Sequence, residues 1–194
     1  MKIVGIALGV VVLFLILFGV IFGIKIVSTR NDLVVQREAV SAAWSQVDVV
    51  LQRRADLIPN LVSTVQGYAK QEKDVFTAIA NARSALIGAR NPQEKIAANG
   101  QLDGALSRLL VITENYPQLK SNENFLRLQD ELAGTENRIA IERRKYNESV
   151  QKYNTNIALF PNNIAASLFG FNRNDAYFKT DAGARTAPKV EFNK

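Results

Sequence analysis

An uncharged apolar run opens the chain and limits what its first part can form. Residues 3–24, IVGIALGVVVLFLILFGVIFGI, contain no charged and no polar side chain. At a helical rise of about 1.5 Å per residue this run spans roughly 33 Å, enough to cross the hydrocarbon core of a bilayer. A cleavable signal peptide has a shorter apolar region, of about 7–15 residues, and a small-x-small cleavage site. Residues 26–28, IVS, match such a site poorly. We therefore predict an uncleaved single-pass transmembrane anchor over residues 1–27.

The charges beside this run give opposite indications of membrane orientation. Lys2 precedes the run, and Lys25, Arg30 and Arg37 follow it. The larger positive charge after the run favours a cytoplasmic position for the rest of the chain. A short basic segment ahead of an apolar run favours the other side of the membrane. Both orientations stay open at this point.

The charge and the missing residue types exclude several classes of function. The chain has 24 Lys and Arg against 18 Asp and Glu, a net charge of +6, and neither His nor Cys. Most zinc, haem, iron–sulfur and thiol chemistry is thereby excluded, together with Ser-His and Cys-His catalysis. Both signs of charge are mixed along the chain, without the one-signed stripe and interleaved aromatics of a nucleic-acid interface. We expect no metal, no cofactor, no nucleic-acid partner and no enzymatic activity.

Apolar side chains recur every three or four residues after the anchor, and this spacing predicts one helix face. The stripe keeps its phase through Pro59, so we predict a continuous or gently kinked helix from Thr29 to Tyr68. A proline inside a helix removes one backbone hydrogen bond at a cost of ~3 kcal/mol, and here it leaves the carbonyl of Ala55 without a partner. The stripe consists of Leu33, Val40, Trp44, Val47, Leu51, Ala55, Ile58, Val62, Val65 and Ala69.

Further amphipathic segments predict three more helices. Asn91 and Asn122 are suitable N-caps for two of them, and the pair Phe160-Pro161 ends the last, since the residue before proline disfavours the helical region. Four helices with short connections predict an all-α antiparallel four-helix bundle over residues 28–161, with two long and two shorter helices. The three segments are residues 72–89, 92–115 and 123–160.

The final segment, residues 162–194, combines a short predicted helix with a mostly irregular tail. We expect the helix over Asn162 to Phe169, irregular chain beyond Gly170, and a polar end over residues 180–194. The aromatic residues of this segment allow three arrangements: packing on the chain's own bundle, insertion into the lipid interface, or docking on a neighbouring protomer. These aromatic residues are Phe169, Phe171, Tyr177 and Phe178.

Two long stretches are similar to the bacterial LemA family. They are AWSQVDVVLQRRADLIPNLVSTVQGYAKQE, from residue 43, and YPQLKSNENFLRLQDELAGTENRIAIERRKYNESVQKYNTNIALFPNNIAASLFGF, from residue 116. The resemblance implies a bacterial inner-membrane protein with one anchor, a helical bundle and no established catalytic activity. It also implies relatives among magnetosome membrane proteins and among partners of membrane metalloproteases. Gln71 departs from the family pattern, which has His there. The matching signature positions are Trp44, Asp48, Arg53, Arg54, Asp56, Leu57, Pro59, Asn60, Tyr116, Pro117, Glu136, Arg138, Tyr146, Asn147, Tyr153, Asn154, Phe160 and Pro161.

Three functions suit such a chain. The first is a non-enzymatic membrane scaffold that self-associates, with the tail aromatics as its contact; membrane confinement raises the effective concentration, so modest contacts suffice. The second is an adaptor for another membrane protein, such as a metalloprotease. Its candidate contacts near the kink are Arg53, Arg54, Asp56, Pro59 and Asn60.

The third function is a catalytic or ligand-binding bundle. It would use Glu136 and Glu142 with Arg138, which lie within two turns of one predicted helix. Such spacing is common on any charged helix. The simpler interpretation of Glu142 is a carboxylate at the edge of the apolar stripe, paired with Arg138 or with a neighbouring helix.

Overall fold

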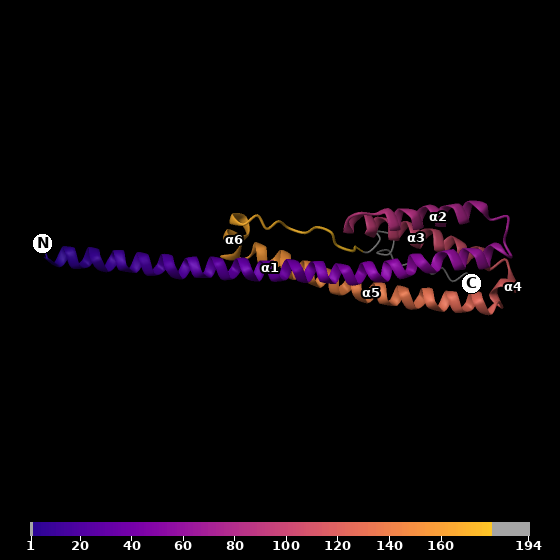
Figure 1. The fold of residues 1–194 in the computed structure, drawn as a ribbon, viewed down its shortest axis with the longest axis horizontal. Helices are drawn as coiled ribbons and strands as arrows, with labels where there is room; N and C mark the ends of the chain where they lie inside the picture. Colours follow the sequence, from indigo (N-terminus) through magenta and orange to yellow (C-terminus); the bar gives the residue numbers. More distant parts are fainter. Residues whose placement is uncertain (1, 180–194) are drawn as a thin grey trace, which may run out of the picture. The chain divides into compact units, whose positions relative to one another are not determined.

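The computed structural model describes residues 2–179, with side chains from Gly9 onward, and every regular element in that part of the chain is an α-helix (Figure 1). The all-α fold predicted from the sequence is confirmed. The polar end predicted over residues 180–194 lies outside the described residues. The helices are α1 (Lys2–Gln66), α2 (Lys73–Gly88), α3 (Pro92–Thr113), α4 (Pro117–Lys120), α5 (Glu123–Ala158) and α6 (Asn162–Leu168).

The chain folds into two compact units, which share the long helices α1 and α5. The first unit comprises Met1–Ser45 and Glu148–Asp175, and the second comprises Gln46–Asn147 and Ala176–Lys194. Helix α1 passes without a break from the apolar run into the second unit. The predicted bundle helix therefore has no separate start at Thr29; it continues the apolar N-terminal helix and ends at Gln66.

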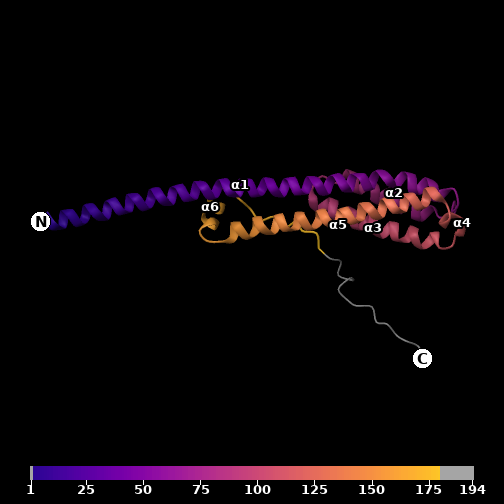
Figure 2. The same cartoon turned by 90° about the horizontal axis from the view of Figure 1, so that it is seen from below.

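The second unit is a bundle of four antiparallel helical segments, from α1, α2, α3 and α5 (Figure 2). Each segment buries one apolar face, and each large apolar side chain buried there contributes about 1.5–3 kcal/mol relative to an exposed one. The positions step by three or four along every helix, as the sequence pattern predicts. The core includes Val47, Leu51, Ile58, Leu61 and Val65 of α1, Phe76, Ile79 and Leu86 of α2, Leu102, Leu106 and Leu109 of α3, and Phe125, Leu128, Ile139 and Tyr146 of α5.

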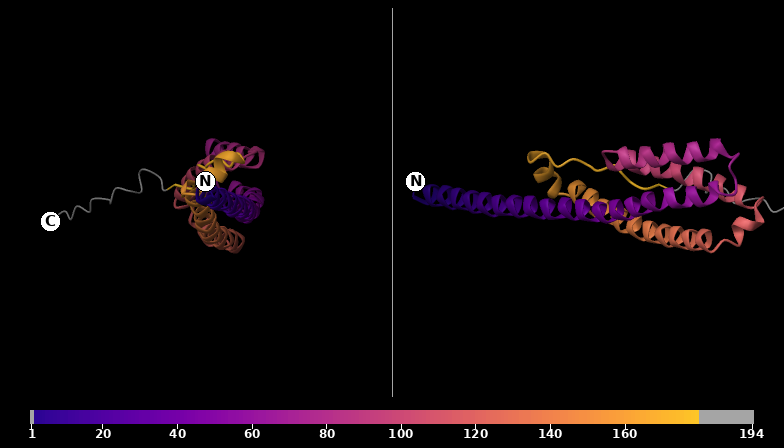
Figure 3. Two further views of the ribbon diagram at one scale, coloured as in Figure 1. Left: turned by 90° about the vertical axis from the view of Figure 1, so that its left-hand side faces the viewer. Right: turned by 45° about the vertical axis from the view of Figure 1, so that its right-hand side comes forward.

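The first unit brings the start of α1, the end of α5 and α6 together. Figure 3 shows α6 beside α1 in both of its views, next to the turn that ends α5. The core of this unit is small, because the only residues that α6 buries are two alanines, Ala165 and Ala166. The buried apolar residues in this unit are Leu33, Val40, Val150, Tyr153, Ala165 and Ala166.

Two predicted helix caps are confirmed. The Asn91 side chain accepts a hydrogen bond from the Glu94 amide (2.9 Å), and the Asn122 side chain accepts one from the Phe125 amide (3.0 Å). Each cap satisfies one backbone donor that a helix N-terminus leaves open. The last helix was predicted to reach Phe160, but α5 ends at Ala158, and Phe160 beyond its end is 79% exposed. The single helical turn α4, after Tyr116, was not predicted.

Pro59 lies inside α1, which stays helical on both sides of it, as predicted. The carbonyl oxygen of Ala55, which has no amide donor because of the proline, accepts a hydrogen bond from Nε of Arg83 at 2.8 Å. Arg83 comes from α2, so the defect in one helix becomes a hydrogen bond between two helices. This bond offsets part of the cost of the proline, since an unsatisfied buried carbonyl costs about 1–3 kcal/mol.

Candidate functional site

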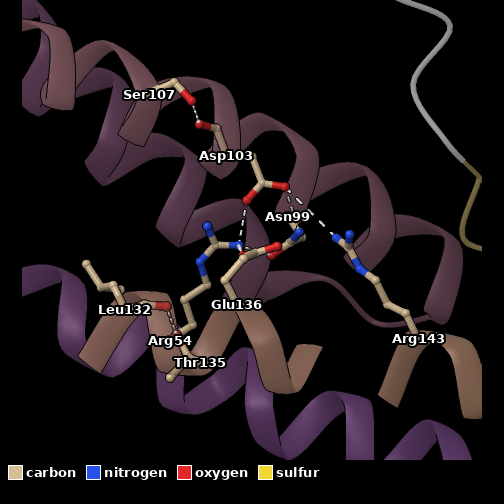
Figure 4. Close-up of polar contacts among 8 residues, drawn as sticks. All are labelled: Arg54, Asn99, Asp103, Ser107, Leu132, Thr135, Glu136 and Arg143. Atoms are coloured by element: carbon tan, nitrogen blue, oxygen red, sulfur yellow. Dashed lines mark hydrogen bonds and ion pairs between the residues drawn. The ribbon is translucent and has the colours of Figure 1, made fainter. Parts of the chain in front are cut away.

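A buried arginine joins three helices of the second unit. Arg54 of α1 is 7% exposed, and its Nη1 atom lies 3.0 Å from Oδ1 of Asn99, 2.5 Å from Oδ1 of Asp103 and 3.0 Å from Oε2 of Glu136. Asn99 and Asp103 belong to α3, and Glu136 belongs to α5 (Figure 4). A charge at this depth requires partners, because burying an unpaired guanidinium costs several kcal/mol. We call these four residues the Arg54 cluster.

One further hydrogen bond and a second guanidinium support the Arg54 cluster. Nδ2 of Asn99 donates to Oδ2 of Asp103 at 3.0 Å, which fixes the amide orientation. Arg143 of α5 approaches the same carboxylate, with its Nη2 atom 3.9 Å from Oδ2 (Figure 4). Two guanidinium groups thus face two carboxylates, and the formal charges balance. The Nε atom of Arg54 is buried and has no hydrogen-bond partner among the described residues.

An apolar groove borders the Arg54 cluster. It has a volume of about 390 Å³ and lies between α1, α3 and α5 of the second unit. It is partly open to solvent, since Leu110, Ser107 and Gln129 of its lining are exposed. The polar end is formed by Arg54, Asp103 and Glu136, and the apolar lining by Leu61, Leu106, Leu109, Leu110, Phe125, Leu132 and Ala133.

The five residues predicted near the kink divide between the interior and the surface. Arg54 is buried in its cluster, whereas Arg53, Asp56, Pro59 and Asn60 are exposed. A charge reversal at Arg54 would therefore bring a third carboxylate beside two others and unfold the second unit, so its effect on a partner cannot be read separately. A surface contact near the kink is left with the four exposed residues.

The residues of the catalytic alternative have separate partners. Glu136 pairs with Arg54, and Glu142 pairs with Lys145, whose Nζ lies 2.8 Å from Oε1. The sequence suggested Arg138 or a neighbouring helix as the partner of Glu142, whereas the ion pair formed is with Lys145 of the same helix. Within the described residues, no group of three or more acidic, histidine or cysteine side chains is placed to hold a metal ion.

In the first unit, the tail packs on the chain's own helices. The Asn154 side chain accepts a hydrogen bond from the Asn174 amide (2.9 Å) and donates one to the Asn174 carbonyl (2.7 Å). The Tyr153 hydroxyl donates to the Asn172 carbonyl at 2.9 Å. Burial raises the pKa of the Tyr153 phenol above its ordinary value of about 10, and the positive charge of Arg37 partly opposes this rise.

The aromatic residues predicted to contact a partner have neighbours within their own units. Arg37 stacks on Phe171, with the guanidinium carbon 5.4 Å from the ring centroid, and Arg30 lies 5.6 Å from the Phe169 ring. In the second unit, Arg143 lies 4.7 Å from the ring of Phe178. Tyr177 and Phe178 are half-buried, while Phe169 is exposed.

The same side-chain chemistry holds the tail in the second unit. Asn147 bonds the Phe178 backbone through both atoms of its amide: Oδ1 accepts from the Phe178 N–H (3.0 Å), and Nδ2 donates to its carbonyl (2.9 Å). Tyr146 contacts the Phe178 ring edge-on, with centroids 5.9 Å apart. The sequence repeats a Tyr-Asn pair seven residues apart, at 146–147 and 153–154, and each Asn bonds both backbone groups of one tail residue.

Sequence reasoning missed Asn99 and Asp103 of the Arg54 cluster and the neighbouring Arg143. The burial of Arg54 could have been predicted from the sequence, because Arg54 lies three residues after Leu51 and four before Ile58, on the buried face of α1. A charge at such a position indicates a buried pair. The sequence contains no signal that selects its partners on α3 and α5.

Comparisons with known proteins find one matching family and several relatives. The sequence model of the LemA family matches residues 43–192. Magnetosome proteins MamQ 1 and MamQ 2 of Paramagnetospirillum magneticum are each 27% identical over 179 residues, covering 79% of this chain and 66% of the relative. Protein LemA of Metamycoplasma hominis is 26% identical over 156 residues, covering 80% of this chain and 71% of its own length. The chain thus spans just under two thirds of the length of the MamQ relatives.

Proposed function

The chain belongs to the LemA family, and we propose that it is a non-enzymatic, membrane-anchored scaffold that self-associates at the bacterial inner membrane. The apolar groove of the second unit is the contact, and the occupant is an apolar helix face of a second copy. The groove supports this assignment because it is a hollow of about 390 Å³ lined mainly by leucines, beside a charge-balanced polar cluster. Helix-in-groove packing uses this kind of surface.

The anchor supports the membrane part of the proposal. Within the described residues, one helix is long and apolar enough to cross a membrane, and it lies near the N-terminus. All large apolar side chains from Val10 to Leu17 are exposed in the isolated chain, as expected for side chains that face lipid. An anchor of this kind would confine all copies of the chain to the same membrane. Confinement of this kind raises their effective concentration.

Exposed apolar residues beside the groove support a contact between copies. Leu110 lines the groove and is 45% exposed, and its neighbour Val111 is exposed as well. Leu126 is exposed on α5. A surface of this type is costly in water and is commonly covered by a partner. The tail aromatics, suggested as the contact by the sequence, are less suitable because Phe171 and Phe178 pack on their own chain.

The test compares two glutamate substitutions in the full-length protein, extracted in mild detergent and measured by light scattering. Leu110→Glu places a charge in the groove, whereas Ile87→Glu places one on α2, outside the groove, at nearly equal exposure (45% and 43%). We expect an oligomer for the unsubstituted protein and for Ile87→Glu, and a much smaller particle for Leu110→Glu. A monomeric unsubstituted protein, or equal masses for both variants, would contradict the proposal.

The alternative is an adaptor whose groove takes an apolar segment of another membrane protein. The exposed residues Arg53, Asp56, Pro59 and Asn60 near the kink give this alternative a polar surface on α1. It predicts a small complex with a different chain that co-purifies with the unsubstituted protein and is lost in Leu110→Glu. Electron microscopy of the extracted particle separates the alternatives, since only the scaffold predicts a uniform ring or cage of identical chains.

A further inference from the structure

An uncharged segment with exposed apolar side chains surrounds α6. Residues 153–172 contain no charged side chain, although 22% of the whole chain is charged. The short helix itself buries only Ala165 and Ala166. Single exposed apolar residues are ordinary, but five large ones within eleven positions form a patch that indicates an apolar neighbour. This α6 patch consists of Leu159, Phe160, Ile164, Leu168 and Phe169.

Contacts within the first unit place α6 at a defined height along α1. The Thr29 hydroxyl donates to Oδ1 of Asn162, at the first residue of α6, over 3.4 Å. The Arg30 guanidinium lies 5.6 Å from the ring of Phe169, at the other end. Because both ends of α6 meet the same turn of α1, α6 runs across the axis of α1 rather than along it, as Figures 1 and 3 show.

This height coincides with the membrane interface that the anchor defines. Thr29 follows Ile24, the last residue of the apolar run, by five residues, which is about 8 Å at the helical rise. The headgroup region on each side of the hydrocarbon core is roughly 5–8 Å thick. A helix that crosses α1 at this height lies in the plane of the interface. Lys25 and Arg30, near the inner and outer limits of this region, add positive charge where lipid phosphates lie.

We propose that the α6 patch is a lipid-binding surface: α6 lies in the headgroup region beside the anchor, and the apolar side chains of the patch extend from it toward the acyl chains. The occupant is the bilayer itself: the apolar side chains of the patch enter the acyl boundary, and the adjacent cations face the phosphates. Interfacial helices bind membranes in this way, with one apolar face buried and the axis in the membrane plane. The proposal rests on the proposed anchoring by α1 and not on self-association through the groove.

The experiment measures the depth of single spin labels in the full-length protein, reconstituted in vesicles of phosphatidylcholine and phosphatidylglycerol. The chain has no cysteine, so one introduced cysteine carries the only label. Leu168→Cys reports the α6 patch, Phe14→Cys the anchor, and Val35→Cys a part of α1 beyond the interface; their exposures are 69%, 67% and 68%. Val35 lies eleven residues beyond Ile24, roughly 16 Å at the helical rise.

The readout is the ratio of accessibility to oxygen, which concentrates in lipid, over accessibility to a water-soluble nickel complex. We expect a ratio at Leu168 several-fold above that at Val35 and below that at Phe14, with the same result for Phe160→Cys. Circular dichroism confirms that each variant is folded. A ratio at Leu168 equal to that at Val35, with Phe14 in lipid, overturns the proposal and leaves the anchor intact.

Two other outcomes also overturn it and are distinguishable. A label at Leu168 that neither reagent reaches, with broadening by nearby labels, shows that the patch is covered by a second copy. An aqueous ratio at Phe14 shows instead that the anchoring itself is wrong, and the proposed function fails with it.

Discussion

Replacing Arg54 by methionine removes the charge that joins α1, α3 and α5 while keeping most of the aliphatic side chain. The substitution deletes the hydrogen bond to Asn99 and the ion pairs with Asp103 and Glu136. It also leaves two carboxylates close together, without the guanidinium between them. We expect the second unit to lose stability, and the structure gives the magnitude.

The hydrogen bond from the guanidinium to Asn99 involves a charged donor, and such a bond contributes about 2 kcal/mol. The two carboxylate side chains are 38% and 45% exposed, so solvent screens their ion pairs. Each of these pairs contributes roughly 0.5 kcal/mol. Arg54→Met should therefore lower the free energy of unfolding by about 3 kcal/mol in total.

The adjacent residue supplies the control. Arg53 is the same residue type, one position earlier on the same helix, but it is exposed. Arg53→Met should change the free energy of unfolding by less than about 0.5 kcal/mol. Urea unfolding of the full-length protein in mild detergent, followed by far-UV circular dichroism, measures both variants under the same conditions.

Equal unfolding midpoints for the two variants would refute the reasoning, because the Arg54 cluster would then contribute no more than a surface charge. A loss confined to Arg54→Met, partly recovered when Glu136→Gln is added, would support it. The added substitution removes one of the two carboxylates that the first change leaves without a partner.

Three further predictions follow from single contacts. Arg83→Met should lower the free energy of unfolding by about 1–2 kcal/mol, because the Ala55 carbonyl loses its hydrogen-bond donor. The same substitution should cost much less in a Pro59→Ala background, because the backbone N–H of Ala at position 59 then donates to that carbonyl. Asn154→Ala removes two hydrogen bonds to the tail, about 2 kcal/mol in total, so tail hydrogen exchange should accelerate roughly 30-fold. Tyr153→Phe should weaken the loss of stability at alkaline pH. Burial raises the pKa of the Tyr153 phenol in the folded state. The stabilisation from this tyrosine is therefore complete below its unfolded-state pKa of about 10 and is lost as the pH rises through its folded-state pKa.

Each of these predictions has a control and an outcome that contradicts it. For Arg83, the double-mutant cycle is the control, and an equal cost in both backgrounds would show that the arginine does not act through the Ala55 carbonyl. Thr155→Ala, at an exposed neighbour, serves as the control for Asn154; similar exchange rates in the two variants would contradict the tail contact. For Tyr153, identical slopes of stability against pH in the two proteins would show that its hydroxyl keeps an ordinary pKa.

Helix positions could be predicted because their signals are local. The three- and four-residue spacing of apolar side chains specified which face of α1 is buried, and this pattern did not depend on knowing the neighbouring helices. Asn91 and Asn122 were identifiable as caps because the backbone donors they satisfy lie three residues ahead. The ends of helices were harder to predict: the last helix was predicted to reach Phe160, yet α5 ends at Ala158.

Sequence alone was enough to predict the apolar N-terminal helix, the all-α class, the continuous helix through Pro59 and the family, because each depends on residue types at short, regular spacings. Contacts between residues far apart in the sequence could be seen in the folded structure alone. Arg83 meets the Ala55 carbonyl across 28 positions, and Arg54 meets Asn99 across 45. Nothing near Arg54 in the sequence specifies which of the many acidic residues will face it. That choice is made by the relative placement of whole helices, which depends on how all of their apolar faces pack together.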